Sequence, residues 1–390
     1  MQFSQRTQRF AGTGSTAWDV HYQATADKSA GRDVVVMSVG DYEVATPKPI
    51  VDSAVQALRD GDTHYTNVVG ITALREAVAR DHQRRTGATT DASNVLITAG
   101  TQNALYFAVQ CLLSSGDEAL VLEPMYVTYE ATIGSSEATL VPIPCPAEQG
   151  FKPSIAAIKA AITPRTRGLF LATPANPTGA VLTREELTEI ADVCREHDLW
   201  VVSDEVYGDL VFDGEMVSMV SLEGMADRTV TVSSLSKSHA MTGWRAGWLV
   251  GPEPLVEHAG RLSLAMHYGI APFIQQAATV ALTEERQLSE QFHALLHTRR
   301  DLLLEELKDT PKLRVLKPAS GMVMLVDVSE TGLTPNQFMH ALYEQTGVSV
   351  LDGAAFGPSS ADFIRLSFSI AEADIREGAR RIKSWLANRP

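Results

Sequence analysis

The chain has 390 residues, a formal net charge of −14 and a sequence pI near 5.2. That length exceeds the usual size of a single domain, so two domains are expected. The acidic balance argues against nucleic acid or an anionic membrane surface as a partner, because both repel negative charge.

The cysteines and the N-terminal stretch indicate the compartment. Cys111, Cys145 and Cys194 lack the spacing of metal ligands and are too few for a disulfide framework, so no metal site is expected. The first residues, "MQFSQRTQRFAGTGS", contain no apolar core of a secretory signal, and no apolar run is long enough to span a bilayer. These features predict a cytoplasmic protein.

Short β-rich stretches alternate with helical segments through the first three quarters of the chain. Most of these stretches are continuous apolar runs, as in strands that are covered on both faces. They are residues 94–100, 118–124, 138–144, 167–174, 200–206, 229–236 and 246–252. Among the helix candidates, residues 183–198 open with a capping-box pattern, Thr183 followed by Glu186. This alternation predicts an α/β fold with a mostly parallel, doubly wound sheet.

The pattern changes near residue 286. A long charged helical stretch, 288–307, is followed by shorter strands at 322–328 and 363–370 and by a last helix at 372–389. We therefore expect a large α/β domain over 46–285. The remainder, 1–45 together with 286–390, would form an N-terminal arm and a smaller α+β domain.

Polar residues follow the predicted strands, where a doubly wound sheet binds its ligands. They are Gly100, Thr101, Gln102, Asn176, Asp204 and the run from Ser234 to Lys237. Singly, each has an ordinary explanation: a surface amine, a turn residue or a cap. As a set they match a ligand that carries a phosphate, a carbonyl and a heteroaromatic ring.

The phosphate requires donors at a helix N-terminus, hydroxyl groups and an arginine, which Thr101, Ser234 and Arg245 supply. The carbonyl requires an amine that is often neutral, and both burial and a neighbouring cation such as Arg245 would lower the pKa of Lys237. The ring nitrogen requires a carboxylate, Asp204, and the ring face requires an aromatic side chain, Tyr126. Pyridoxal 5'-phosphate (PLP) has these three features.

The motifs that carry this set resemble those of the class I and II aminotransferases, along essentially the whole chain and in the family's order. They are "SVGD", "THYT", "TAGTQNAL", "PANPTG", "SDEVY", "SLSKSHAMTGWR" and "FIRLSFS". The resemblance implies PLP-dependent transferase fold type I: a mostly parallel seven-stranded sheet covered by helices, plus a smaller α+β domain. It also implies a homodimer with shared active sites.

The resemblance assigns catalytic roles to Lys237, Asp204 and Tyr207. Lys237 would form the Schiff base with the cofactor and act as general base, and Asp204 would pair with the ring nitrogen. Tyr207 and Asn176 would donate to the ring's phenolic oxygen, and Tyr126 would stack on the ring. The residues implied for the phosphate cup are Gly100, Thr101, Gln102, Ser234 and Arg245.

The remaining implied residues concern the substrate and the second subunit. Arg365 matches the clamp for the substrate α-carboxylate, assisted by Asn176 and the backbone at Gly40. Tyr65 matches a tyrosine that reaches the phosphate of the neighbouring subunit. The chain departs from the family pattern at Tyr42 and Asp352, which flank the substrate side, so side-chain specificity is less well defined than cofactor binding.

The amino donor depends on finer similarity. "AWDVHYQA", "EPMYVTYEA" and "HDLW" resemble the arginine–pyruvate transaminase group, which suggests a basic or guanidino amino acid as donor and pyruvate as acceptor. Asp19 and Glu43 are candidates to bind the guanidinium group of such a donor. The alternative, that both are solvated surface carboxylates, is at least as common in an acidic protein.

Other functions stay open at this level. They are an aminotransferase for aspartate, aromatic or neutral amino acids, or a PLP-dependent lyase, oxidase or cyclase of guanidino amino acids. A ligand-sensing regulator on the same fold is a further alternative, but it would need a DNA-binding module that neither the N-terminal segment nor the charge provides.

Overall fold

The structure is a computed structural model, and it describes residues 3–10 and 17–389. Its main feature is a 7-stranded sheet in the order β2-β8-β7-β6-β5-β3-β4. Only β8 runs antiparallel to its neighbours β2 and β7. The strands are β2 (Val95–Ala99), β3 (Glu118–Glu123), β4 (Thr139–Pro144), β5 (Thr166–Ala172), β6 (Trp200–Asp204), β7 (Thr229–Ser234) and β8 (Ala246–Val250). The predicted mostly parallel α/β sheet is confirmed.

Helices cover both faces of this sheet because neighbouring apolar residues of a strand point to opposite sides. Val121 packs in one cluster with helices α4, α5 and α9, whereas Leu120 packs on the other face with α6 and α7. A third cluster joins the β2 and β8 end of the sheet to α2, α3 and α10. These helices are α2 (Lys48–Arg59), α3 (Thr72–Thr86), α4 (Thr101–Leu112), α5 (Tyr129–Gly134), α6 (Ile155–Ala161), α7 (Arg184–Glu196), α9 (Glu253–Met266) and α10 (Pro272–Thr283).

The start of α7 illustrates how local sequence sets an element's boundary. The Thr183 hydroxyl accepts a hydrogen bond from the backbone N–H of Glu186, and the Glu186 carboxylate accepts one from the N–H of Thr183. This reciprocal pair satisfies N–H groups that have no partner inside the helix. The predicted capping box is confirmed.

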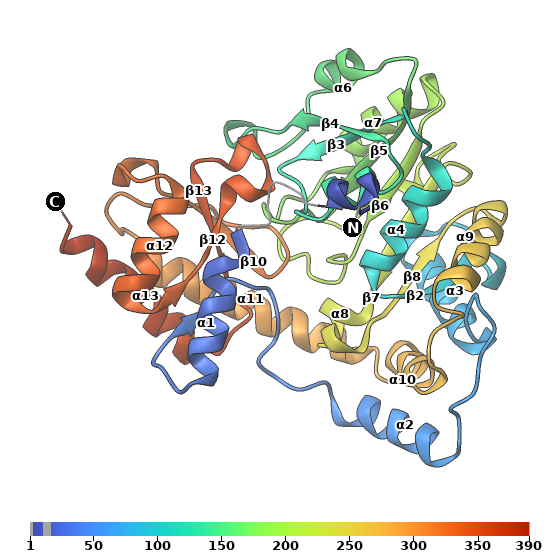
Figure 1. Cartoon of the computed structure of the whole chain (residues 1–390), viewed down its shortest axis with the longest axis horizontal. Coiled ribbons are helices and arrows are strands. Elements are labelled where there is room, and N and C mark those ends of the chain that lie inside the picture. Colours follow the sequence, from blue (N-terminus) through green and yellow to red (C-terminus); the bar gives the residue numbers. More distant parts are fainter. Residues whose placement is uncertain (1–2, 11–16, 390) are drawn as a thin grey trace.

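A second sheet lies in the C-terminal part, in the order β12-β13-β10-β9 with antiparallel pairs. Its strands are β9 (Arg314–Val315), β10 (Val323–Asp327), β12 (Leu351–Asp352) and β13 (Phe363–Ser367). It packs in one apolar cluster with α11 (Gln287–Leu307), α12 (Pro335–Thr346) and α13 (Glu372–Ala387). Helix α11 runs from the region of α8 (Leu235–Ser238) and α10 to the region of α12 and α13 (Figure 1).

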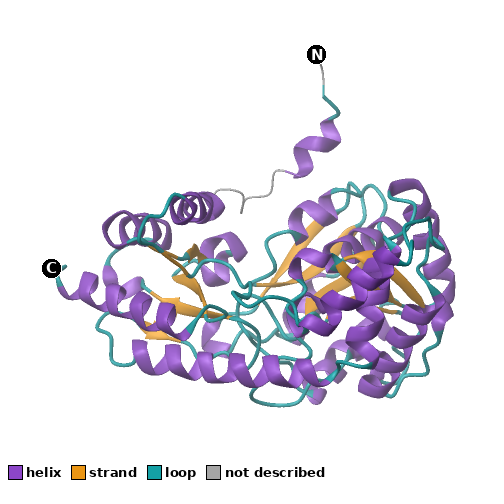
Figure 2. Ribbon diagram, turned by 90° about the horizontal axis from the view of Figure 1, so that it is seen from below, coloured by secondary structure: helices purple, strands orange, loops and turns teal. Residues whose placement is uncertain are grey.

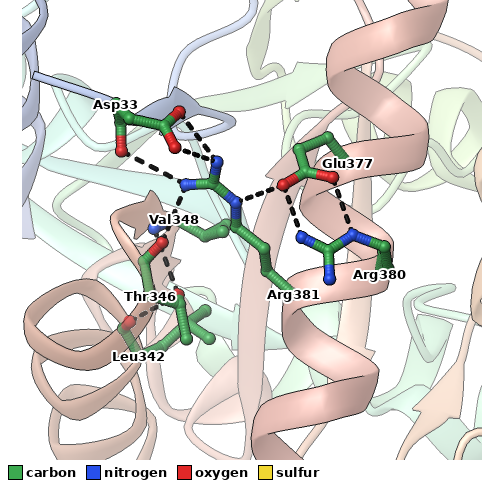
Figure 3. A network of polar contacts seen from close by, with 7 residues as sticks. All are labelled: Asp33, Leu342, Thr346, Val348, Glu377, Arg380 and Arg381. Atoms are coloured by element: carbon green, nitrogen blue, oxygen red, sulfur yellow. Dashed lines mark hydrogen bonds and ion pairs between the residues drawn. The ribbon is translucent and has the colours of Figure 1, made fainter.

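Part of the N-terminal segment packs against this second sheet region. Strand β1 (Val35–Val36) pairs in parallel with β11 (Val348–Ser349), and α1 (Asp19–Ser29) lies beside the C-terminal helices (Figure 1). Arg381 of α13 fixes this arrangement: its guanidinium donates to the Asp33 carboxylate at 2.8 Å and to the Thr346 carbonyl at 2.9 Å (Figure 3).

The short 3-10 helix η1 (Gln5–Phe10) behaves differently from the rest of the predicted arm. It lies near the N-terminal end of the chain, outside the body of the molecule in Figure 2, and contacts α5 of the large sheet region. The proposed domain division at 45 and 286 stays a prediction. In the described part of the chain, no helix combines the length and the apolar character needed to cross a membrane.

The remaining single-turn elements connect these helices and strands. They are η3 (Ala92–Asn94), η4 (Ala147–Gln149), η5 (Met219–Ser221), η6 (Thr242–Trp244), η7 (Ser329–Thr331), η8 (Gly353–Phe356) and η9 (Pro358–Ser360).

Strand β8 approaches the start of α4 so closely that only glycine fits at position 247. A Cβ on Gly247 would lie 2.6 Å from the Gly100 carbonyl carbon and 2.9 Å from the Thr101 nitrogen. We expect Gly247→Ala to destabilise the protein by about 1–3 kcal/mol, because backbone atoms on both sides would have to shift. The thermal unfolding midpoint measures this effect.

Gly243→Ala is the matched control, because a Cβ on Gly243 meets no atom within 4 Å. Equal unfolding midpoints for the two variants would contradict the steric argument.

Candidate functional site

A cavity of about 200 Å³ lies where the carboxyl ends of β5, β6 and β7 face the second sheet. Ala172, Asp204 and Ser234 end those three strands, and Val323 and Arg365 come from β10 and β13. The cavity brings together most of the predicted site residues: Gly40, Thr101, Gln102, Tyr126, Asn176, Asp204, Tyr207, Ser234, Lys237, Arg245 and Arg365.

Lys237 provides an amine with a depressed pKa. It lies in α8, the single helical turn that follows β7, and its Nζ donates to the Gly40 carbonyl at 2.6 Å. Burial lowers the pKa of Lys237 to about 8; Asp41 opposes this effect, and Arg365 and Arg245 add to it. A useful fraction of this amine is therefore neutral near neutral pH, as a nucleophile or a general base requires.

Asp204 lies at the end of β6, buried below the cavity. Burial raises the pKa of this carboxyl to about 6, against the hydrogen bonds of Tyr129 and of the Val206 N–H, which lower it. The Tyr129 hydroxyl donates to Oδ2 at 2.9 Å. One carboxylate oxygen is thus held by a buried phenol, and the carboxylate can stay ionised in an apolar setting.

Two tyrosines complete the walls around Asp204. The Tyr126 ring meets the Tyr129 ring edge-on, with centroids 5.9 Å apart and an interplanar angle of 83°. Tyr207 is buried, and burial raises its pKa, so its hydroxyl remains a hydrogen-bond donor at neutral pH.

The start of α4 forms an anion cradle. Gly100 precedes the helix with φ at 77°, a conformation that favours glycine, and a Cβ there would lie 2.2 Å from Nη2 of Arg245. The Thr101 hydroxyl oxygen is buried and has no hydrogen-bond partner among the described residues. The free N–H groups of a helix N-terminus, this hydroxyl and the arginine suit a phosphate group.

Two other predicted members of the phosphate cup contribute in a limited way. The Gln102 side-chain amide is partly occupied, since it donates to Thr132 at 2.8 Å and accepts from Thr128 at 2.7 Å, which leaves one side-chain N–H and the backbone N–H to face an anion. The Ser234 side chain caps α8 by accepting from the Ser236 N–H.

Arg365 is a buried cation with neutral partners. Its Nη1 donates to Asn176 Oδ1 at 3.1 Å and its Nη2 to the Ser38 carbonyl at 2.9 Å. Its Nε has no partner among the described residues, and burial lowers its pKa to about 10. A carboxylate would supply the charge that this guanidinium lacks.

Besides Gly100, three predicted residues are absent from the cavity lining: Glu43, Asp19 and Tyr65. The Glu43 carboxylate pairs with the buried Arg299, with one contact at 2.9 Å, so it is committed to holding the segment after Gly40 and is not an open acceptor for a guanidinium. Asp19 is exposed at the start of α1, next to a cavity residue, Trp18. Tyr65 is 84% exposed and contacts the Tyr268 ring at a tilt of 53°, with centroids 4.7 Å apart.

Sequence reasoning missed three aromatic or polar residues that line the cavity or touch its charged groups: Trp18, Tyr129 and Thr242. Trp18 and Tyr129 lie within stretches that carried the family resemblance, but neither follows a predicted strand directly. Of the two departures from the family pattern, the Tyr42 hydroxyl donates to the Lys237 carbonyl at 2.6 Å, and Asp352 caps η8.

The sequence is similar to that of known aminotransferases. The family model described as aminotransferase class I and II covers residues 32–382. The chain is 50% identical to the arginine–pyruvate transaminase of Pseudomonas aeruginosa, over 98% of this chain and 97% of that protein. It is 35% identical to an aromatic-amino-acid aminotransferase of Thermococcus litoralis, over 90% and 92% of the two chains.

Solved structures of aminotransferases have the same fold as this chain. The aspartate aminotransferase of Thermus thermophilus with maleate superposes with a TM-score of 0.93 at 32% identity, covering 98% of this chain and 99% of that chain. An aspartate aminotransferase of Thermotoga maritima gives 0.92 at 28% identity, over 99% and 100%. The chain therefore belongs to the aminotransferase class I and II family and is a PLP-dependent aminotransferase with the aspartate aminotransferase fold.

Proposed function

We propose that this enzyme transfers the amino group of L-arginine, or of a similar basic amino acid, to pyruvate. The observation that carries the proposal is the 50% identity, over almost the whole of both chains, to an arginine–pyruvate transaminase. The cations that line the cavity are Lys237, Arg245 and Arg365 in the described residues, and each has a proposed role already. A distal substrate carboxylate would therefore lack a cation of its own, which disfavours aspartate and glutamate.

The described residues fit PLP. Bound PLP would supply an electron sink that weakens the Cα–H bond of the amino acid. Lys237 would hold the cofactor covalently, and once freed its Nζ would carry the α-proton of the amino acid as general base and acid. Asp204 would accept the N–H of the ring nitrogen and keep it protonated.

The phosphate end and the ring edge would be held by neighbouring elements. The start of α4 at Gly100 and Thr101, with Gln102 through its backbone, would bind the phosphate together with Ser234 and Arg245. Tyr207 and Asn176 would donate to the phenolic oxygen, and Tyr126 would stack on the ring face.

The substrate α-carboxylate would bind Arg365. The two outer guanidinium nitrogens already contact Asn176 and Ser38, so the fork is oriented before substrate arrives. Gly40 would contribute its backbone. The Gly40 carbonyl now accepts from Nζ of Lys237, so the same loop contacts both the amine and the substrate end of the cavity.

We also propose a homodimer that works in the cytoplasm. Tyr65 lies beside an exposed apolar run on and after α9, where Leu264, Met266 and Tyr268 are 48%, 58% and 51% exposed. A second copy that covers this surface would bury it and could receive Tyr65 near its phosphate cradle. The three free cysteines suit a reducing compartment.

A donor panel tests the proposed substrates. Purified enzyme is expected to be yellow, and arginine without a 2-oxo acid should bleach the visible cofactor band, which pyruvate should restore. Turnover should require pyruvate, release no ammonia and consume no oxygen. Faster bleaching by aspartate or an aromatic amino acid than by arginine would refute the proposed donor, and ammonia release without pyruvate would indicate lyase chemistry.

The role of Lys237 is tested by Lys237→Ala. Loss of the only proposed proton carrier should lower turnover at least about a thousandfold, because positioned general bases contribute about 10² to 10⁴ and covalent attachment is lost as well. The measurement is kcat with arginine and pyruvate. Lys48→Ala, which removes an exposed surface amine, serves as the control and should keep wild-type turnover.

The Tyr129 hydroxyl should set the acidic limb of the pH profile. Its hydrogen bond lowers the pKa of Asp204, so Tyr129→Phe should raise that pKa, and the carboxylate should be protonated at a pH where the wild type keeps it ionised. Activity should therefore be lost earlier as the pH falls, with the limb of kcat/KM displaced upward by about one pH unit.

Tyr106→Phe is the matched control, since Tyr106 packs against the same apolar cluster without touching Asp204 in any described contact. An unchanged profile for Tyr129→Phe would show that the phenol does not tune Asp204.

A further inference from the structure

Among the described residues of the N-terminal segment, Trp18 is the one large aromatic side chain that lines the cavity. It directly precedes α1 and lines the same cavity as Asn176, Lys237 and Arg365. Neither Asp19 nor Glu43 lines the described cavity, and Glu43 is paired with Arg299. Besides the backbone at Gly40, the N-terminal segment therefore contributes an indole ring to this side of the cavity.

A chain of contacts fixes the Trp18 ring relative to the carboxylate clamp. The His21 ring meets the Trp18 ring edge-on, with centroids 5.7 Å apart. His21 Nδ1 lies 2.8 Å from the Ser38 hydroxyl, and the Ser38 carbonyl accepts from Nη2 of Arg365. Ser38 thus supports both Trp18, through His21, and Arg365, the residue that would bind the α-carboxylate.

The face of Trp18 is not already occupied by a cation. The described cation–π pairs place arginines over Phe212, Phe356, Phe363 and Trp385. Burial, followed by the charge of Arg365, lowers the pKa of His21, so this neighbour is neutral at pH 7. The ring can therefore accept a cation from a substrate.

The acidic groups of the cavity cannot serve a guanidinium. Asp204 is the single carboxylate among the described lining residues; it already accepts from the Tyr129 hydroxyl and the Val206 N–H, and it would pair with the ring nitrogen of the cofactor. A cationic side chain held by its α-carboxylate at Arg365 would find no free carboxylate in that lining. An indole face is the strongest aromatic partner for a guanidinium, which stacks well on it.

Resting on the proposed arginine specificity, we propose that Trp18 determines the donor by stacking against the guanidinium of the bound amino acid. The residue recognises positive charge through its ring and takes no part in proton transfer. It acts on kcat/KM for a cationic donor more than on kcat/KM for a neutral donor of the same shape.

Arginine and citrulline separate charge from shape, because citrulline replaces the guanidinium with a neutral urea of nearly the same size. The holoenzyme is assayed with each donor and pyruvate, for the wild type, Trp18→Leu and Trp18→Phe. Trp18→Leu should lower kcat/KM for arginine about five- to thirtyfold and for citrulline no more than about threefold. Trp18→Phe should lie between, since a phenyl ring is a weaker partner for a cation. The visible absorbance of bound cofactor reports whether each variant is folded.

Tyr22→Leu is the matched control, because Tyr22 is an aromatic residue on the same helix that is 66% exposed and also contacts His21. It should leave the ratio of the two donors unchanged. Equal losses for arginine and citrulline in Trp18→Leu would overturn this inference while leaving arginine as the donor. A wild type that uses alanine but not arginine would overturn the proposed donor and the inference together.

Discussion

The buried guanidinium of Arg365 is the constraint on which the proposed substrate site depends. Among the described residues it contacts only neutral groups: the Asn176 amide oxygen, the Ser38 carbonyl and the face of Phe356. A buried cation without a counter-ion is costly, which is why its pKa is lowered. Under the proposed function, a substrate carboxylate would remove that cost when it binds. The unpaired charge would then be a binding determinant that the protein maintains at the expense of its own stability.

The fold makes this arrangement possible, and most of it could be predicted from the sequence. The apolar runs predicted the strands of the large sheet because strands covered on both faces have a strong and continuous signal. The antiparallel direction of β8 was not predicted, since direction depends on how the chain returns to the sheet and not on the run itself. The contact of η1 with α5 was likewise missed, because nothing in six polar-rich residues specifies a docking partner.

Site residues at or directly after a predicted strand could be predicted from the sequence, and residues elsewhere in the chain less well. Asp204 ends β6 and Lys237 follows β7, the parallel neighbour of β6. The topology alone therefore places these two residues close together. Tyr129 lies in α5, after β3. Its sequence position does not indicate a role in the site, because its hydrogen-bond partner Asp204 is 75 residues away. Glu43 was read as a free acid because Arg299, which pairs with it, is 256 residues further along. Tyr65 is predicted to reach the phosphate of a second subunit, so its role stays a prediction in the structure of a single chain.

The same unpaired charge links substrate binding to the chemistry at Lys237. Arg365 is the larger of the two cationic influences that lower the pKa of that amine. A substrate carboxylate bound to Arg365, as proposed, would cancel most of its field at Nζ, so the proton affinity of the amine would rise. Before the cofactor binds, Lys237 is therefore more often neutral and ready to react with the carbonyl of an incoming cofactor. Under the proposed function, the amine freed from the cofactor would be a stronger base once an amino acid occupies Arg365, at the stage when a proton must be removed from the substrate.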